Sequence, residues 1–144
     1  MTKEDKGHFG EKHGENRKPD PLVADALRRE SDDGQIACVV AFKIASETGR
    51  DPSEIGVTAD LLELRLCKCQ LGLFGYSPRK RIVKAAEEVS EDLRKRIQAS
   101  LTENRLSCAA AWKIAKDSGL RKMAVSSACE KLGIKISHCQ LGAF

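Results

Sequence analysis

The sequence predicts a mainly α-helical protein with short β-strands, built from two copies of one unit. The second half of the chain repeats the first at a constant offset of 70 residues, without a gap, from Ile36/Leu106 to Phe74/Phe144. Apolar residues recur at helical spacing in both copies, and glycines follow the periodic segments. Two units of roughly 55 residues each lie near the lower limit for independent stability, so packing contacts beyond a single copy are expected.

The composition favours a cytoplasmic protein with no membrane contact. No apolar run approaches the roughly 18 residues that span a bilayer, and the first residues lack the apolar core of a signal peptide. In that setting reduced thiols are the expected state of the six cysteines.

The net charge of +4 is unevenly distributed. Residues 20–76 carry six basic and ten acidic side chains, whereas residues 77–144 carry fourteen basic and seven acidic ones. If the protein binds a polyanion, the second copy and the segment before it are therefore expected to provide the contact.

The chain opens with a charged tail over residues 1–19, which has too few apolar residues to order itself. The first helix of each copy is predicted to start at Asp20 and at Ser90, because both side chains are good N-caps. A short extended piece follows, at residues 35–37 and 105–107.

A second helix is predicted from about residue 38 to 48, and again from 108 to 118. Its apolar face has the i, i+3, i+4, i+7 spacing. The residues of that face are Cys38, Ala41, Phe42 and Ala45 in the first copy, and Cys108, Ala111, Trp112 and Ala115 in the second. Gly49 and Gly119 end these helices, since glycine adopts the left-handed conformation at least cost.

A third helix, a strand and a linker complete the prediction. The third helix is expected to begin at Asp51-Pro52 and reach about residue 63, and in the second copy to run from about 122 to 132. Alternating apolar and polar residues then predict strands at 64–67 and 134–137. The expected domains are the tail (1–19), an acidic first repeat (20–76), a basic helical linker (77–89) and a basic second repeat (90–144).

This order of elements, with a tight turn between the second and third helices, resembles the winged helix-turn-helix superfamily. The resemblance rests on an alanine four residues before a glycine and an apolar residue six positions after it. The residues are Ala45, Gly49 and Ile55 in the first copy, and Ala115, Gly119 and Val125 in the second. It covers both copies, and it implies tandem winged-helix-like units that bind DNA. A full wing needs a returning strand, and neither copy supplies one.

The two third helices differ in chemistry. The first presents acidic groups such as Glu54 and Asp60, and carboxylates are repelled by phosphates. The second offers cations and hydroxyls near its start, where recognition helices lie deepest in the major groove. The expected DNA contacts are Arg121, Lys122, Ser126 and Ser127, with Lys131 and Lys135 nearby. The alternative is a solvated helix face without a ligand.

Three cysteines and one histidine cluster near the ends of the copies. Cys67, Cys69, His138 and Cys139 would supply the four ligands of a zinc site if the repeat ends meet. Thiol redox sensing is a second possibility. The repeated Cys-Gln-Leu-Gly-x-Phe motif favours a third interpretation, a structural clasp in which Leu and Phe are buried and Gly permits a tight bend.

The sequence therefore favours a small DNA-binding regulator whose second repeat contacts duplex DNA. The acidic first repeat would pack or bind a protein partner. No catalytic motif or cofactor motif stands out, so we expect no enzymatic activity and no cofactor. The alternatives are a protein-interaction or adaptor module and a thiol- or metal-responsive switch.

Overall fold

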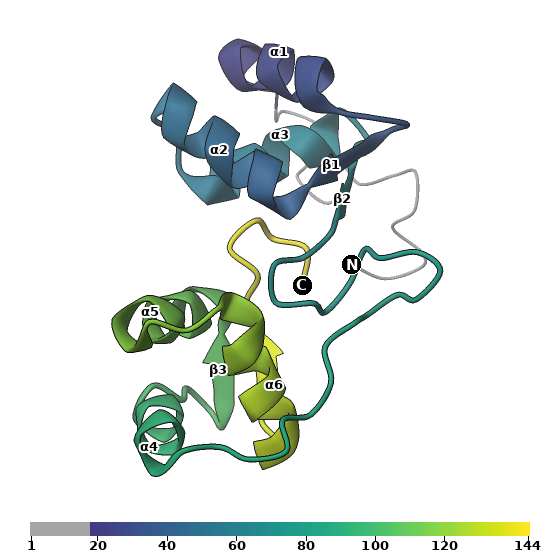
Figure 1. Cartoon of the computed structure of the whole chain (residues 1–144). Helices are drawn as coiled ribbons and strands as arrows, with labels where there is room; N and C mark the ends of the chain where they lie inside the picture. Colours follow the sequence, from purple (N-terminus) through teal and green to yellow (C-terminus); the bar gives the residue numbers. More distant parts are fainter. Residues whose placement is uncertain (1–17) are drawn as a thin grey trace. The chain divides into compact units, whose positions relative to one another are not determined.

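The computed structural model describes residues 18–144, which are mainly α-helical with a few short strands, as predicted (Figure 1). The first repeat contains α1 (Pro21–Glu30), β1 (Gln35–Ala37), α2 (Cys38–Thr48), α3 (Pro52–Leu61) and β2 (Arg65–Cys67). The second contains α4 (Glu91–Ala99), β3 (Arg105–Ser107), α5 (Cys108–Ser118), α6 (Lys122–Leu132) and β4 (Lys135–Ser137). The tail predicted over residues 1–19 lies outside the described residues as far as residue 17.

Three helices surround a small core in each repeat. α2 packs against α1 and α3, and α5 packs against α4 and α6. Four buried apolar residues of each core are equivalent at the 70-residue offset. They are Leu27, Ile36, Ile44 and Ile55 in the first repeat, and Ile97, Leu106, Ile114 and Val125 in the second. The same apolar pattern therefore buries the same faces twice.

Each repeat also contains a two-stranded parallel sheet. Ile36 of β1 lies opposite Leu66 of β2, and Leu106 of β3 lies opposite Ile136 of β4. Parallel strands need a long crossover, which the second and third helices of each repeat provide. The strand after the third helix is thus paired with the strand before the second helix. In residues 18–144 the named strands form no antiparallel hairpin of the kind that a wing requires.

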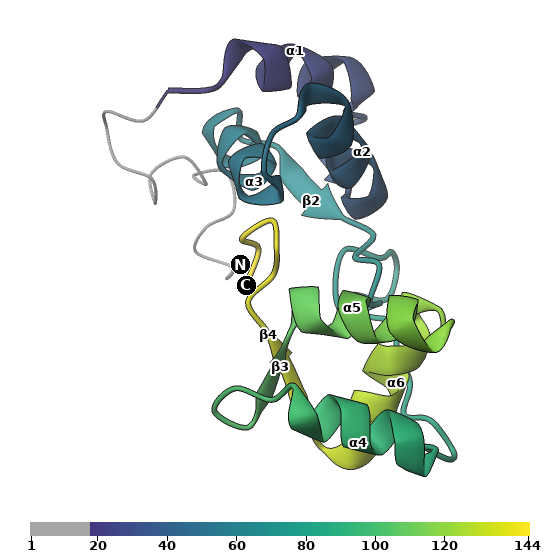
Figure 2. The ribbon, with the colours of Figure 1, turned by 90° about the vertical axis from the view of Figure 1, so that its left-hand side faces the viewer.

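The compact units of the structure do not coincide with the sequence repeats. The first unit contains the described residues up to Cys69 together with Gln140–Phe144, and the second unit contains Gln70–Cys139. We call residues 70–74 the first clasp and residues 140–144 the second clasp. Each clasp is therefore part of the unit that contains the helices of the other repeat (Figure 2).

The linker predicted as a helix over residues 77–89 is wrong: the chain between β2 and α4 contains no helix. Tertiary contacts of the second unit hold it in an irregular path instead. Val83 is buried, its backbone N–H donates to the Gly72 carbonyl, and the Ala86 N–H donates to the Ser127 carbonyl of α6. Such long-range bonds satisfy backbone groups that a helix would have paired locally, and local propensity is overridden.

The first helices of the two units are fixed at their starts by different means. Asp20 caps α1 by accepting from the backbone N–H of Leu22 at 3.0 Å, and the Arg50 Nε donates to its carboxylate at 2.7 Å. The hydrogen bond from Arg50 lowers the pKa of Asp20. In the second unit Ser90 caps α4, and Leu120 occupies the position of Arg50. Only the first unit therefore has an ion pair between the residue after the second helix, Arg50, and the N-cap of the first helix, Asp20.

Candidate nucleic-acid interface

The candidate interface of the second unit is built on the turn between α5 and α6. Gly119 ends α5 in the left-handed conformation, with φ of 67°, and α6 begins three residues later at Lys122. Arg121 is the N-cap of α6, and its side chain makes no capping hydrogen bond. The Arg121 guanidinium therefore lies at the start of α6 and does not cap that helix.

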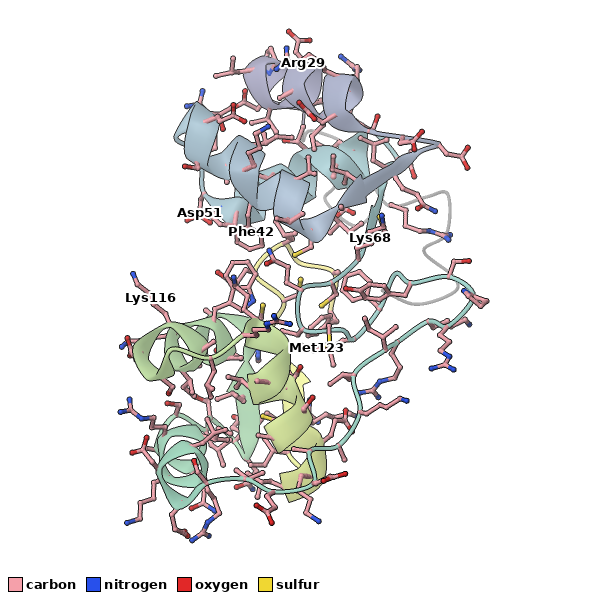
Figure 3. The ribbon with its side chains drawn as sticks, viewed as in Figure 1. Arg29, Phe42, Asp51, Lys68, Lys116 and Met123 are labelled. Carbon is pink, nitrogen blue, oxygen red and sulfur yellow. The ribbon has the colours of Figure 1, made fainter. Side chains whose placement is uncertain are left out.

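A shallow hollow of about 450 Å³ lies over this turn. It is lined by Trp112, Lys113, Ala115, Lys116, Leu120, Arg121 and Lys122. The Nζ of Lys122 lies 4.4 Å from the centre of the Trp112 ring, a cation–π contact that holds the ammonium group in place. Lys113 is paired with Asp117 at 2.7 Å, and Lys116 projects from α5 (Figure 3). We call these four cations and Trp112 the basic hollow.

The equivalent positions of the first unit have a different chemistry. Lys116, Arg121 and Lys122 correspond to Ser46, Asp51 and Pro52. Asp51 caps α3 by accepting from the Ser53 N–H at 3.0 Å, and Figure 3 shows it at the turn before that helix. Hydrogen bonds from Ser53 lower the pKa of Asp51, so this carboxyl group favours its charged form. The basic hollow therefore has no counterpart in the first unit.

Not all the DNA contacts expected from the sequence lie in the basic hollow. Arg121 and Lys122 do. Lys131 and Lys135 are exposed, but they lie in the last turn of α6 and on β4. Lys131 is ten residues beyond Arg121, which corresponds to about 15 Å along a helix. The sequence placed Trp112 with the packing face of the second helix and did not select Lys113 or Lys116. The difference between Ser46 in the first copy and Lys116 in the second was the sequence feature that could have indicated this site.

Ser126 was expected to contact DNA, and the structure corrects this expectation. Its side chain is buried, and its hydroxyl donates to the Leu71 carbonyl oxygen at 2.6 Å. A hydroxyl held in this way cannot reach a phosphate or a base edge. Ser127 is half-buried, and its carbonyl accepts from Ala86.

The first clasp and the segment after it lie along one face of α6 (Figure 1). We call these residues the cover. Met123 contacts the backbone near Gly72, where an added Cβ would lie 3.0 Å from the Met123 Cε. Glu130 forms an ion pair with Arg81. Positions 123, 126, 127 and 130 share one helix face. The first clasp and the segment after it therefore cover the face that would have to enter the major groove.

We expect Ser126→Ala to destabilise the protein by about 1–3 kcal/mol, because the buried Leu71 carbonyl loses its hydroxyl donor. The measurement is urea unfolding followed by circular dichroism. Ser127→Ala is the matched control, and its expected change is within about 0.5 kcal/mol. Equal losses in the two variants would show that the Ser126–Leu71 bond does not hold the cover.

The third helix of the first unit is covered in an equivalent way. Gly56 is the counterpart of Ser126, and a Cβ added there would overlap the carbonyl oxygen of Leu141 in the second clasp. Leu141 and Ala143 are buried. The yellow end of the chain lies beside α3 in both ribbon views (Figure 1, Figure 2). Glycine is thus required at this position because the clasp backbone lies directly on the helix.

The proposed zinc ligands are divided between the two units. Cys67 and Cys69 belong to the first unit, and His138 and Cys139 belong to the second. Within residues 18–144, no group of three or more His, Cys, Asp or Glu side chains is arranged to hold a metal ion. Burial raises the pKa of the Cys67 thiol and raises the pKa of Cys129 to about 11.

These thiols should differ in reactivity towards iodoacetamide. Because the thiolate is the nucleophile, Cys129 is expected to stay unmodified in the folded protein at pH 8. Cys139 is half-buried whereas the other five cysteines are buried, so it should react first. Mass spectrometry of partly alkylated protein shows the order in which the cysteines react. Early modification of Cys129 would contradict the buried environment assigned to it.

No family model, curated protein or solved structure matches the chain. Within residues 18–144, no helix has both the length and the apolar character needed to cross a membrane.

Proposed function

We propose that the second unit binds duplex DNA through its basic hollow, as part of a small regulatory protein of the cytoplasm. The observation that carries the proposal is that four cations line one hollow together with Trp112, over the turn between α5 and α6. This hollow lies in a unit with fourteen basic and seven acidic side chains over residues 70–139. Lysine and arginine that neutralise phosphates supply most of the affinity of non-specific DNA binding.

The mode of contact follows from the cover on α6. The start of the helix offers Arg121 and Lys122, whereas Ser126 and Glu130 face the protein's own chain. Contacts to phosphates are therefore available and contacts to base edges along the helix face are not. Since sequence is read mainly by contacts to base edges, we expect little sequence preference while the cover is in place.

The test is fluorescence anisotropy with two labelled 20-base-pair duplexes of unrelated sequence. With three or four phosphate contacts, affinity should fall roughly 40- to 150-fold between 50 and 200 mM salt. The two duplexes should bind with similar affinity. Absence of binding at low salt, or binding that salt does not weaken, would exclude the proposal and favour an adaptor module that recognises a protein.

A further inference from the structure

The two clasps exchange places between the units. The chain passes from the first unit to the second between Cys69 and Gln70, and returns between Cys139 and Gln140. Both clasps have the sequence Gln-Leu-Gly-x-Phe. The two surfaces that receive them are the equivalent faces of α3 and α6. In each unit, one face of the third helix therefore binds the clasp of the other repeat.

The contact point is the same in the two units, although the chemistry differs. Leu71 is fully buried, and its carbonyl oxygen accepts from Ser126. Leu141 is 2% exposed, and its backbone lies against Gly56, where no side chain intervenes. Ser126 and Gly56 are equivalent positions, as are Leu71 and Leu141. The leucine backbone is thus placed on the third helix by a hydrogen bond in one unit and by the absence of a Cβ in the other.

We propose that α3 is an interaction surface for the second clasp of another copy of this chain. The second clasp is a five-residue segment that reaches its receiving face only by leaving the second unit. An element exchanged within a chain can make the same contacts between chains, which is a low-cost route to dimers. Within one chain the short tether supplies an effective concentration in the millimolar range. Exchange between chains therefore requires that docking within the chain is prevented and that the protein concentration approaches this range.

Two full-length variants separate the clasp from its receiving surface. Gly56→Ala blocks α3 by placing a Cβ against Leu141 and leaves the second clasp unchanged. Leu141→Asp disables the clasp, because it puts a charge at a buried leucine, and leaves α3 unchanged. The experiment is size-exclusion chromatography with light scattering on each variant and on their equimolar mixture, loaded at about 1 mM so that the concentration matches the range that the tether supplies.

Each variant alone should elute as a monomer of 15.8 kDa. The mixture should contain a species of twice that mass, in which the clasp of the Gly56→Ala chain occupies α3 of the Leu141→Asp chain. The double variant Gly56→Ala/Leu141→Asp is the control donor, and its mixture with Leu141→Asp should stay monomeric. A mixture of two folded single variants that remains monomeric would overturn the proposal.

A peptide of residues 138–144 tests the same contact when Gly56→Ala does not fold. Labelled with fluorescein and added to the Leu141→Asp protein, it should bind saturably at concentrations up to about 1 mM, the range that a short tether supplies. The same peptide with Leu141→Asp should not bind. Equal signals from the two peptides, or no binding by either, would overturn the proposal.

Discussion

Replacing Gly56 with alanine is expected to destabilise the first unit by about 1–3 kcal/mol, the usual cost of an extra methyl group in a packed site. This loss would occur even though alanine is about 1 kcal/mol better than glycine in a helix interior. The cause is the Leu141 backbone, whose carbonyl oxygen occupies the place of the new Cβ. Urea unfolding measured by circular dichroism gives the change in stability.

The Leu141→Asp background provides the internal control for this prediction. When the second clasp no longer docks, the added methyl group meets nothing, and the gain in helix propensity remains. Gly56→Ala should then stabilise the protein by up to about 1 kcal/mol. This reversal of sign is a coupling between two contacting residues, which a double-mutant cycle isolates. An equal loss in both backgrounds would mean that Gly56 has another role.

The Arg121→Ala/Lys122→Ala variant is expected to bind duplex DNA about 100-fold more weakly at 50 mM salt. Each lost phosphate contact removes a counterion-release contribution of about one order of magnitude at this salt concentration. The fold should be retained, because Arg121 makes no capping hydrogen bond. Lys122 loses a contact with Trp112 that is worth about 0.5–1 kcal/mol at an exposed site. Fluorescence anisotropy on the labelled duplex measures the change.

Arg28→Ala/Arg29→Ala is the matched control, since it removes the same charge from exposed positions of α1 in the first unit. Arg29 is labelled on this helix in Figure 3. We expect a change in affinity of less than about twofold, because neither arginine lines the basic hollow, and a cation that contacts no phosphate adds no counterion release. Equal losses in the two double variants would show that net charge, and not the basic hollow, determines binding.

Most of the helices could be predicted from the sequence because their signals are local. Gly49 and Gly119 end α2 and α5 in the left-handed conformation, and Asp20 and Ser90 cap α1 and α4. The internal repeat added a second, independent copy of each pattern. These features depend on residues within one or two turns of each other, so the sequence carries them directly.

The path of the linker and the role of Ser126 could not be predicted, because both depend on contacts between distant residues. The bonds from Val83 to Gly72 and from Ala86 to Ser127 replace the helix expected at residues 77–89. The sequence predicted an exposed hydroxyl at Ser126 because its hydrogen-bond acceptor, the Leu71 carbonyl, is 55 residues away in the chain. Because both clasps share the pattern Gln-Leu-Gly-x-Phe, either one could be assigned to either helix face from the sequence, and the repeat pattern does not reveal that they are exchanged.

The most direct test of DNA binding by the basic hollow is the salt dependence of duplex affinity for the wild-type protein and the Arg121→Ala/Lys122→Ala variant. If both cations contact phosphates, the slope of log K against log salt should be shallower by about 2 in the variant. Arg28→Ala/Arg29→Ala should keep the wild-type slope. Identical slopes for the wild-type protein and the Arg121→Ala/Lys122→Ala variant would show that neither Arg121 nor Lys122 contacts the DNA, and would contradict the basic hollow as the interface.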